Sequence, residues 1–213
     1  MTESPLIIAL DVESAAQARA LVKALGDSAG FYKVGMELYA AAGMEFVREL
    51  IGTGKRVFLD QKYYDIGETV KRATAQVAAS GVRFLTVHAQ RAVVRAAVEG
   101  KGDSSLKVLA VTVLTNFDDS DLRRDGHSCS VGDLVSLRVK NAIEAGADGI
   151  VCSPLEVAGV RQLAGPNTIL VTPGVRSAGA AAGDQKRVAT PAEAIRNGAD
   201  YLVIGRHDRK SVV

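Results

Sequence analysis

Two acids and a lysine lie within six positions of the stretch FLDQKYYDIGET, residues 58–69. Asp60 and Lys62 are two residues apart, so on a strand their side chains project from the same face. Asp65 follows the strand, where a helix is expected to begin. Charged side chains are costly to bury unless they are paired, so this cluster is either a structural ion pair with a helix-capping Asp65 or a functional site. The spacing alone leaves both interpretations open.

A second lysine, Lys33, interrupts the apolar segment FYKVGM at residues 31–36. If its strand lies beside the strand of Asp60, then Lys33, Asp60, Lys62 and Asp65 form a ring of alternating charge. Such a ring would keep an ammonium protonated and oriented without a metal ion. The ammonium could stabilise negative charge that develops on carbon and then donate a proton to that carbon.

Eight short apolar segments are predicted to be strands, and their near-continuous hydrophobicity is typical of strands buried on both faces of a parallel sheet. They are residues 6–12, 31–36, 56–61, 84–89, 107–114, 149–152, 168–174 and 201–206. Helices are predicted between them, for example at residues 14–25, 38–52, 67–80, 131–145 and 191–198. This alternation predicts an α/β fold, a (β/α)8 TIM barrel that forms one domain over residues 1–213.

The catalytic residues of such barrels lie at the C-terminal ends of the strands. Charged or polar residues occur at or just beyond most of these ends. They are Asp11, Lys33, Asp60, Lys62, His88, Thr115, Arg176 and Arg206. Loops are polar in any protein, but the recurrence of charge at so many strand ends favours an active site.

An anion site is predicted on the other side of the barrel mouth. A long Gly/Ala-rich loop, TPGVRSAGAAAGDQKR at residues 172–187, follows the seventh predicted strand and carries Arg176 and Gln185. The eighth strand ends in Gly205 and Arg206. Loops after strands seven and eight of this fold often bind phosphate, and arginine matches the geometry of a phosphate group. The loop is also long enough to fold over a ligand as a lid.

Composition narrows the class of protein. The net charge is +2 with acids and bases interspersed, so the sequence lacks the basic stripe of a nucleic-acid-binding protein. No apolar run approaches the length of a membrane span, and the N-terminal residues do not resemble a signal peptide. Two cysteines cannot form a disulfide framework. We therefore expect a cytoplasmic protein that binds neither nucleic acid nor membrane.

The chain resembles the orotidine 5'-phosphate decarboxylases from its start to residue 206. The shared motifs are ALDV with Asp11, YKVG with Lys33, LDQKYYDIGET, VTVLT with Thr115, and TPGVR, GDQKR and IGR near the end. The resemblance implies a lyase of pyrimidine biosynthesis that converts orotidine 5'-phosphate to UMP and needs no cofactor or metal. It also implies a homodimer in which each active site is shared between two subunits.

Residue roles follow from the resemblance, position by position. Lys62 would protonate C6 of the pyrimidine after carbon dioxide leaves, and Asp60 would lie beside the departing carboxylate. Lys33 would orient Asp60 and touch the ribose. The remaining positions are Asp11 for a ribose hydroxyl, Thr115 for the pyrimidine pocket, Asp65 and Thr69 for the site of the other subunit, and Arg176, Gln185, Gly205 and Arg206 for the phosphate.

Two alternatives remain open. A wider group that shares the D-x-K-x-x-D motif includes metal-dependent sugar-phosphate enzymes, but these typically carry an acid where this chain has Lys33. After IGR the sequence reads HDRKSVV, where the family usually has a proline and another helix. The eighth helix is therefore expected to be missing or shortened. A nucleotide-phosphate-binding barrel whose activity is impaired by this altered end is the second alternative.

Other reactive residues have simpler explanations. His88 ends the fourth predicted strand and is interpreted as a structural hydrogen-bonding residue rather than a catalyst, because Lys62 already supplies the proton. His127 and Cys129 form an H-x-C pair without a second pair of ligands nearby, so no metal site is predicted. Cys152 ends a buried strand and is expected to be a small core residue.

Overall fold

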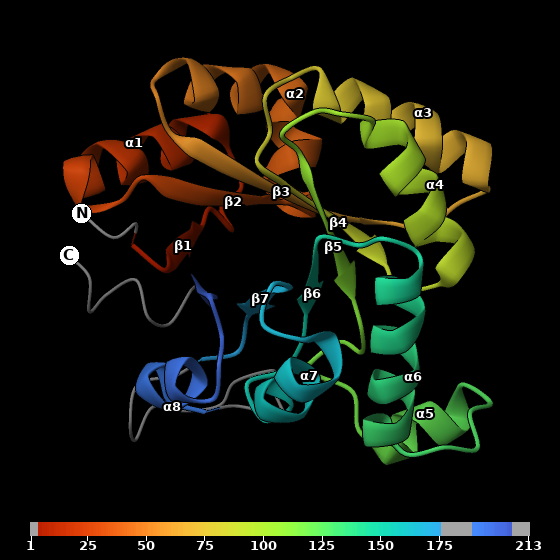
Figure 1. The fold of residues 1–213 in the computed structure, drawn as a ribbon. Coiled ribbons are helices and arrows are strands. Elements are labelled where there is room, and N and C mark those ends of the chain that lie inside the picture. Colours follow the sequence, from red (N-terminus) through yellow and green to blue (C-terminus); the bar gives the residue numbers. More distant parts are fainter. Residues whose placement is uncertain (1–3, 176–188, 206–213) are drawn as a thin grey trace.

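The computed structural model describes residues 4–175 and 189–205, which form a closed barrel of eight parallel strands (Figure 1). Each strand pairs with the next along the chain, and β8 pairs with β1 to close the barrel. The strands are β1 Leu6–Ala9, β2 Phe31–Gly35, β3 Arg56–Tyr63, β4 Phe84–His88, β5 Lys107–Val111, β6 Gly149–Val151, β7 Ile169–Thr172 and β8 Tyr201–Ile204. The predicted TIM-barrel fold is confirmed.

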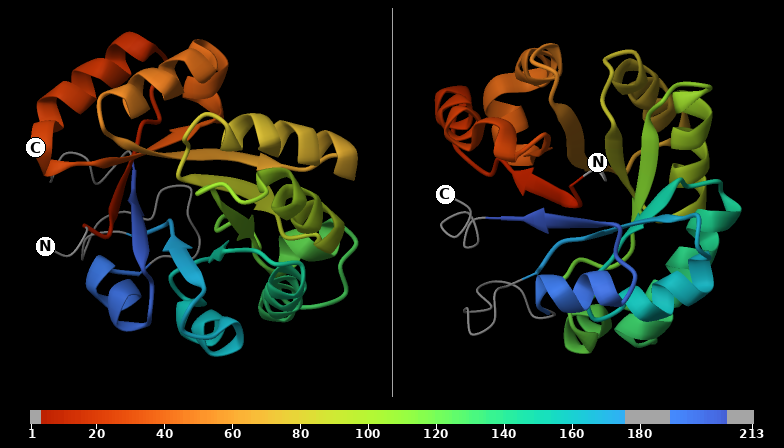
Figure 2. Two further views of the ribbon diagram at one scale, coloured as in Figure 1. Left: turned by 45° about the horizontal axis from the view of Figure 1, so that its top comes forward. Right: turned by 60° about the vertical axis from the view of Figure 1, so that its left-hand side comes forward.

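Helices surround the strands on the outside of the barrel, as both views in Figure 2 show. They are α1 Ala15–Leu25, α2 Met36–Gly52, α3 Gly67–Ala78, α4 Arg91–Lys101, α5 Asp119–Arg124, α6 Val131–Glu144, α7 Val157–Ala164 and α8 Pro191–Arg196, with a short 3-10 turn at Gly26–Ser28. Local sequence sets several of their starts. Ser130 and Thr190 each form a capping box with an acid three residues later, which satisfies the free N–H groups at the starts of α6 and α8.

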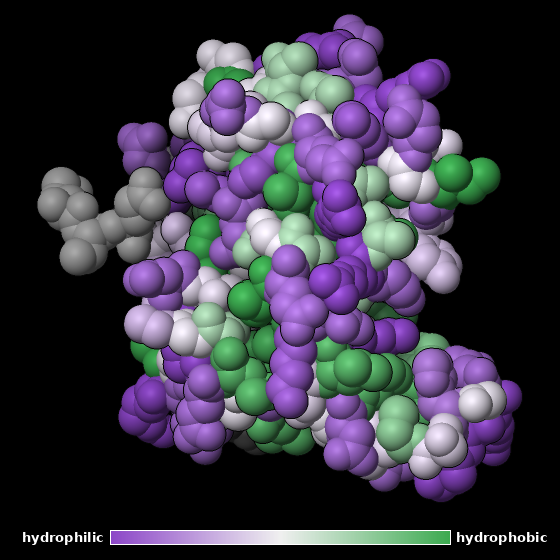
Figure 3. Space-filling model, turned by 45° about the vertical axis from the view of Figure 1, so that its right-hand side comes forward, coloured by the Kyte–Doolittle hydropathy of each residue, from purple (hydrophilic) through white to green (hydrophobic). Residues whose placement is uncertain are grey.

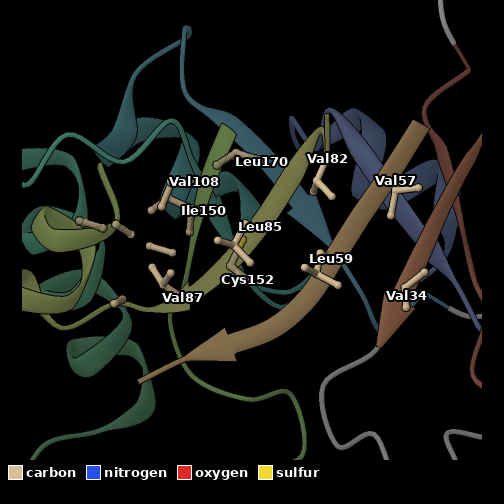
Figure 4. Close-up of a cluster of buried hydrophobic side chains, with 14 of the residues drawn as sticks. Val34, Val57, Leu59, Val82, Leu85, Val87, Val108, Ile150, Cys152 and Leu170 are labelled. Atoms are coloured by element: carbon tan, nitrogen blue, oxygen red, sulfur yellow. The ribbon is translucent and has the colours of Figure 1, made fainter. Parts of the chain in front are cut away.

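Two separate hydrophobic layers hold the barrel. Side chains that point outward from the strands pack against the helices, and Figure 4 shows Val57, Leu59 and Leu85 among them. Side chains at alternate positions point inward and form the smaller layer. Its buried members are Ile7, Ala9, Phe31, Phe58, Phe84, Leu109, Val111, Val151, Val171 and Val203. Because both faces of each strand are covered, the strands are hydrophobic along most of their length.

Four rings close the N-terminal end of the barrel interior, and we call Phe31, Phe58, Phe84 and Tyr201 the aromatic floor. The centroid of Phe84 lies 5.1 Å from Phe31, 5.9 Å from Phe58 and 5.3 Å from Tyr201. These are tilted and edge-on contacts, the arrangement that aromatic quadrupoles favour. Among the described residues, these rings therefore fill the barrel interior away from the C-terminal ends of the strands.

Several strands end earlier than their hydrophobicity predicted. β1 ends at Ala9 instead of residue 12, and β5 ends at Val111 instead of residue 114. Beyond these ends, Val113 and Leu114 line the mouth of the barrel and Leu10 packs in the outer layer, so hydrophobicity alone could not separate them from the strands. The expected loss of the eighth helix concerns residues 206–213, which lie outside the described residues.

No helix within residues 4–175 or 189–205 is long and apolar enough to cross a bilayer. Figure 3 shows hydrophilic and hydrophobic residues interspersed over one face.

Candidate active site

Four charged side chains meet above the inward hydrophobic layer, and we call Asp11, Lys33, Asp60 and Lys62 the charged row. The Nζ atom of Lys33 lies 2.9 Å from Asp11 Oδ1 and 3.5 Å from Asp60 Oδ2, and Lys62 Nζ lies 2.8 Å from Asp60 Oδ1. The signs alternate along the row and cancel. A Cβ at Gly35 would come within 3.1 Å of Lys33 Nζ, so the glycine of the YKVG motif leaves the space that this ion pair uses.

The alternation of side chains along the strands explains why these charges lie together inside the barrel. Asp11, Lys33 and Asp60 each come two residues after a member of the inward layer, Ala9, Phe31 and Phe58 respectively. Side chains two apart on a strand point to the same side, so the row continues the inward face toward the mouth.

Burial and pairing act in opposite directions on the central pair. Burial alone would raise the pKa of Asp60, but Lys33 and Lys62, with hydrogen bonds from Lys62 and Thr86, outweigh it and lower that pKa. Burial alone would lower the pKa of Lys33, but Asp60 and Asp11 outweigh it and raise that pKa. Both groups therefore stay charged at neutral pH, in a place where an uncompensated charge would be expensive.

Lys62 has an unusual backbone. Its φ is +50°, and it is the one non-glycine residue with a positive φ in the described ranges. The pairing of β3 with β4 shifts register between Leu59 and Tyr63, so Lys62 lies in a bulge. The prediction that Asp60 and Lys62 come together is consistent with their 2.8 Å contact, but the regular alternation assumed for it does not hold at Lys62. Bulges of this kind often occur beside active sites, where they redirect a side chain.

The charged row lies in a cavity of about 570 Å³ at the mouth of the barrel. That volume suits a ligand of nucleotide size. The lining residues are Ala9, Asp11, Lys33, Phe58, Asp60, Lys62, Val111, Val113, Leu114, Thr115, Asn116, Val151, Cys152, Pro173, Gly174, Val203 and Gly205. One side of the cavity is thus charged, and the opposite side, from β5, β6 and β7, is mainly apolar.

Most of the site residues named from the sequence fall in this cavity, and two do not. Thr115 and Gly205 line it together with the charged row. Asp65 and Thr69 are exposed and do not line it. Asp65 accepts a hydrogen bond from the N–H of Ile66 and does not cap α3. Arg176, Gln185, Arg206 and the proposed lid lie outside the described residues.

Within this chain, Asp11 and not Asp65 is the second acid of the charged row. The predicted ring was Lys33, Asp60, Lys62 and Asp65, whereas the contacts within this chain run from Asp11 through Lys33 and Asp60 to Lys62. The pairing of β1 with β2 brings Asp11 beside Lys33. That contact depends on the pairing of β1 with β2, which the local spacing in FLDQKYYDIGET does not encode.

His88, His127 and Cys129 do not line the cavity of the charged row, whereas Cys152 lines it. The His88 ring lies outside the main cavity and packs against Tyr64, with 5.5 Å between the ring centroids. Burial lowers the pKa of His88, and the positive charges of Arg138 and Lys62 lower it further. Cys129 and Cys152 form no disulfide. Within residues 4–175 and 189–205, no cluster of three or more His, Cys, Asp or Glu side chains is placed to hold a metal ion.

Thr86 is a site residue that the sequence interpretation did not consider. It donates a hydrogen bond to Asp60 and accepts one from the backbone of Lys62. Its signal was present in the sequence, because it follows Phe84 by two residues, as Asp60 follows Phe58. A polar residue at that inward position is as informative as the charges on neighbouring strands.

Comparison with known proteins identifies the family. The sequence profile of the Orotidine 5'-phosphate decarboxylase / HUMPS family matches residues 4–207. The chain belongs to this family. It is 53% identical to the orotidine 5'-phosphate decarboxylase of Rhodopseudomonas palustris (strain HaA2) over 201 residues, which cover 94% of this chain and 86% of the relative. It is also 53% identical to that of Nitrobacter winogradskyi over 206 residues, which cover 97% of this chain and 86% of the relative.

A solved structure of the decarboxylase family has the same fold. The crystal structure of orotidine 5'-phosphate decarboxylase from Lactobacillus acidophilus superimposes with a TM-score of 0.84 and 34% sequence identity, covering 99% of this chain and 96% of that one. The resemblance noted from the motifs thus extends to the whole described barrel.

Proposed function

We propose that this protein decarboxylates orotidine 5'-phosphate to UMP in pyrimidine biosynthesis. The observation that carries the proposal is the charged row, in which the Lys62 ammonium is held 2.8 Å from a buried carboxylate inside a nucleotide-sized cavity. Family membership supports the same activity, because the relatives named above are orotidine 5'-phosphate decarboxylases.

The proposed reaction needs one proton and one departing group. The bond between C6 of the pyrimidine and its carboxylate breaks, the electron pair stays on C6, and carbon dioxide leaves. The Lys62 ammonium stabilises that negative charge and donates a proton to C6, which gives UMP and a neutral amine. The amine then recovers a proton from water. Preorganised charge aimed at a developing anion is an effective form of transition-state stabilisation.

Asp60 and Lys33 support this step in the proposal. Asp60 lies beside the substrate carboxylate, and repulsion between the two like charges is relieved when carbon dioxide departs. Lys33 keeps Asp60 ionised and oriented, and both Lys33 and its partner Asp11 are assigned to the ribose. Thr115 and Gly205, which also line the cavity, are assigned to the pyrimidine and the phosphate.

The phosphate is assigned to Arg176, Gln185, Gly205 and Arg206, of which Gly205 lies within the described residues. The phosphate is remote from C6. Binding energy from such a remote group can be used to order the site and offset strain at the reacting carbon. We therefore expect the phosphate to contribute to the rate of decarboxylation as well as to binding.

We also propose a cytoplasmic homodimer in which Asp65 and Thr69 complete the site of the other subunit. Both side chains are exposed in this chain, and neither lines its own cavity. The large apolar side chains Tyr64 and Ile66, which flank Asp65, are 65% and 77% exposed, as expected of residues that a partner covers. The absence of a disulfide between Cys129 and Cys152 is compatible with a reducing compartment.

The deciding experiment follows the ultraviolet absorbance of orotidine 5'-phosphate mixed with the protein, with a chelator present. Steady conversion to UMP would support the proposal and a mechanism without a metal. Binding of UMP by folded protein without conversion would support the alternative of a binding-competent but inactive barrel. Activity that the chelator abolishes would point to the metal-dependent sugar-phosphate enzymes of the wider group.

A further inference from the structure

Thr86 lies directly behind the charged row without touching the cavity. It is the third residue of β4, its exposed fraction is 0%, and it does not line the main cavity. A substrate in the cavity therefore cannot contact its hydroxyl. Any influence of Thr86 on the reaction must act through other side chains.

The bulge in β3 places Thr86 opposite three residues at once. Leu59 pairs with Leu85 and Tyr63 pairs with Val87, so residues 60–62 face Thr86 alone. The ordinary ladder of backbone hydrogen bonds cannot continue across this mismatch. In its place, the N–H of Lys62 donates to Thr86 Oγ1 at 2.9 Å.

The same hydroxyl also holds the carboxylate. Thr86 Oγ1 donates to Asp60 Oδ1 at 2.9 Å, and that oxygen also accepts from Lys62 Nζ at 2.8 Å. An ionised carboxylate can only accept hydrogen bonds, so the hydroxyl proton points to Asp60 and its lone pair faces the N–H of Lys62. Thr86 therefore links the backbone of Lys62 to Asp60, the carboxylate that pairs with the Lys62 ammonium. The three hydrogen bonds form a closed circuit that begins and ends at Lys62.

This circuit accounts for the backbone of Lys62. A non-glycine residue with φ of +50° is strained, and such a conformation persists only where its surroundings enforce it. We propose that Thr86 is a positioning residue, which holds the Lys62 backbone and the Asp60 carboxylate so that the ammonium faces the reacting carbon. This inference rests on the decarboxylation proposed above for its kinetic consequences, but its geometric content does not depend on that activity.

The main test is Thr86→Val, which keeps the shape of the side chain and removes both hydrogen bonds. We expect kcat to fall about 10- to 100-fold, the size expected for lost hydrogen bonds to a charged group. UMP affinity should change by less than about threefold, since Thr86 itself does not line the cavity. Thr86→Ser keeps the hydroxyl and should retain kcat within about threefold of wild type.

Two further variants separate positioning from packing. Thr74→Val is the matched control, because Thr74 is fully buried on α3 and its hydroxyl has no hydrogen-bond partner among the described residues. It should leave kcat unchanged. Thr86→Cys matches serine in shape but hydrogen-bonds weakly, so it should be as slow as Thr86→Val, and it takes over the test if the valine variant does not fold.

The outcomes are distinct. A Thr86→Val enzyme with kcat within threefold of wild type would overturn the inference, as would a serine variant as slow as the valine one. If wild type itself converts no substrate, the proposed function fails, and crystal structures of wild type and Thr86→Val decide the geometric question. Loss of the 2.8 Å contact between Lys62 and Asp60 in the variant would support positioning by Thr86, and an unchanged contact and φ would refute it.

Discussion

Removing the positive charge at Lys33 should destabilise the fold much more than removing an exposed lysine. Lys33 Nζ contacts Asp11 at 2.9 Å and Asp60 at 3.5 Å, and its side chain is 11% exposed. Lys33→Met keeps the length of the side chain and removes its charge. Two carboxylates then remain with the single ammonium of Lys62, so the row changes from neutral to a net negative charge.

The size of the effect follows from burial. Breaking a buried ion pair by removal of one partner typically costs about 3–5 kcal/mol. We expect the lower end, about 3 kcal/mol, because Asp60 keeps its contact with Lys62 and because the side chain of Asp11 is 27% exposed. The matched control is Lys71→Met. Lys71 and its partner Glu99 are 46% and 47% exposed, so this pair is worth less than about 1 kcal/mol.

Urea unfolding at pH 7, followed by circular dichroism, measures the free energy of unfolding of both variants. The pH dependence gives a second check. The pKa of Asp60 is lowered in the folded protein, so its stabilising contribution is present above its ordinary value of 3.8 and is lost as the pH falls below it. Lys33→Met removes part of that contribution. The difference in free energy of unfolding between wild type and Lys33→Met should therefore become smaller in this acidic range.

A Lys33→Met protein as stable as wild type at pH 7 would refute the reasoning, as would a deficit no larger than that of Lys71→Met. A deficit that stayed constant from pH 7 down through the acidic range would show that lost packing, and not lost charge, is the cause.

Three further predictions test the site and the helix packing. Lys62→Ala should lower kcat, measured by ultraviolet absorbance, by at least about 10⁴-fold. Its affinity for UMP, measured by calorimetry, should change by less than about threefold. Turnover near the wild-type rate would exclude Lys62 as the proton donor. Inactive Lys62→Ala and Asp65→Ala proteins should regain part of the activity when mixed, because one heterodimer site is free of both changes; no recovery after verified subunit exchange would argue against a shared site. Gly100→Ala should lower the free energy of unfolding in urea by about 1–3 kcal/mol, because the added Cβ would overlap the backbone carbonyl of Lys71. Gly159→Ala, in open space on α7, should raise it by about 0.5–1 kcal/mol. Equal effects of the two substitutions would contradict this reasoning.

The barrel was predictable because parallel strands buried on both faces leave a strong hydrophobic signal. All eight predicted strands occur, at the predicted places in the chain. The ends of the strands were less predictable, since apolar residues such as those after Val111 serve the mouth of the barrel as well as the sheet. Local hydrophobicity does not distinguish the two uses.

The candidate site was predictable in composition and less so in geometry. Asp60 and Lys62 do meet, but through a bulge that a two-residue period does not anticipate. The contact of Asp11 with Lys33 depends on the register in which β1 pairs with β2, which the sequence of either strand alone does not give. Thr86 was missed because a threonine in an apolar strand resembles an ordinary β-branched residue until its inward position is counted.

The aromatic floor fills the barrel interior on the side opposite the cavity mouth. Phe31, Phe58 and Phe84 are almost completely buried, and together with Tyr201 they fill the interior on the side opposite the mouth. In the proposed reaction, we expect substrate, carbon dioxide, UMP and the proton that recharges Lys62 all to pass through the mouth of the cavity. Bound UMP would then lie between solvent and the Lys62 amine, so we expect the amine to recover its proton after UMP leaves.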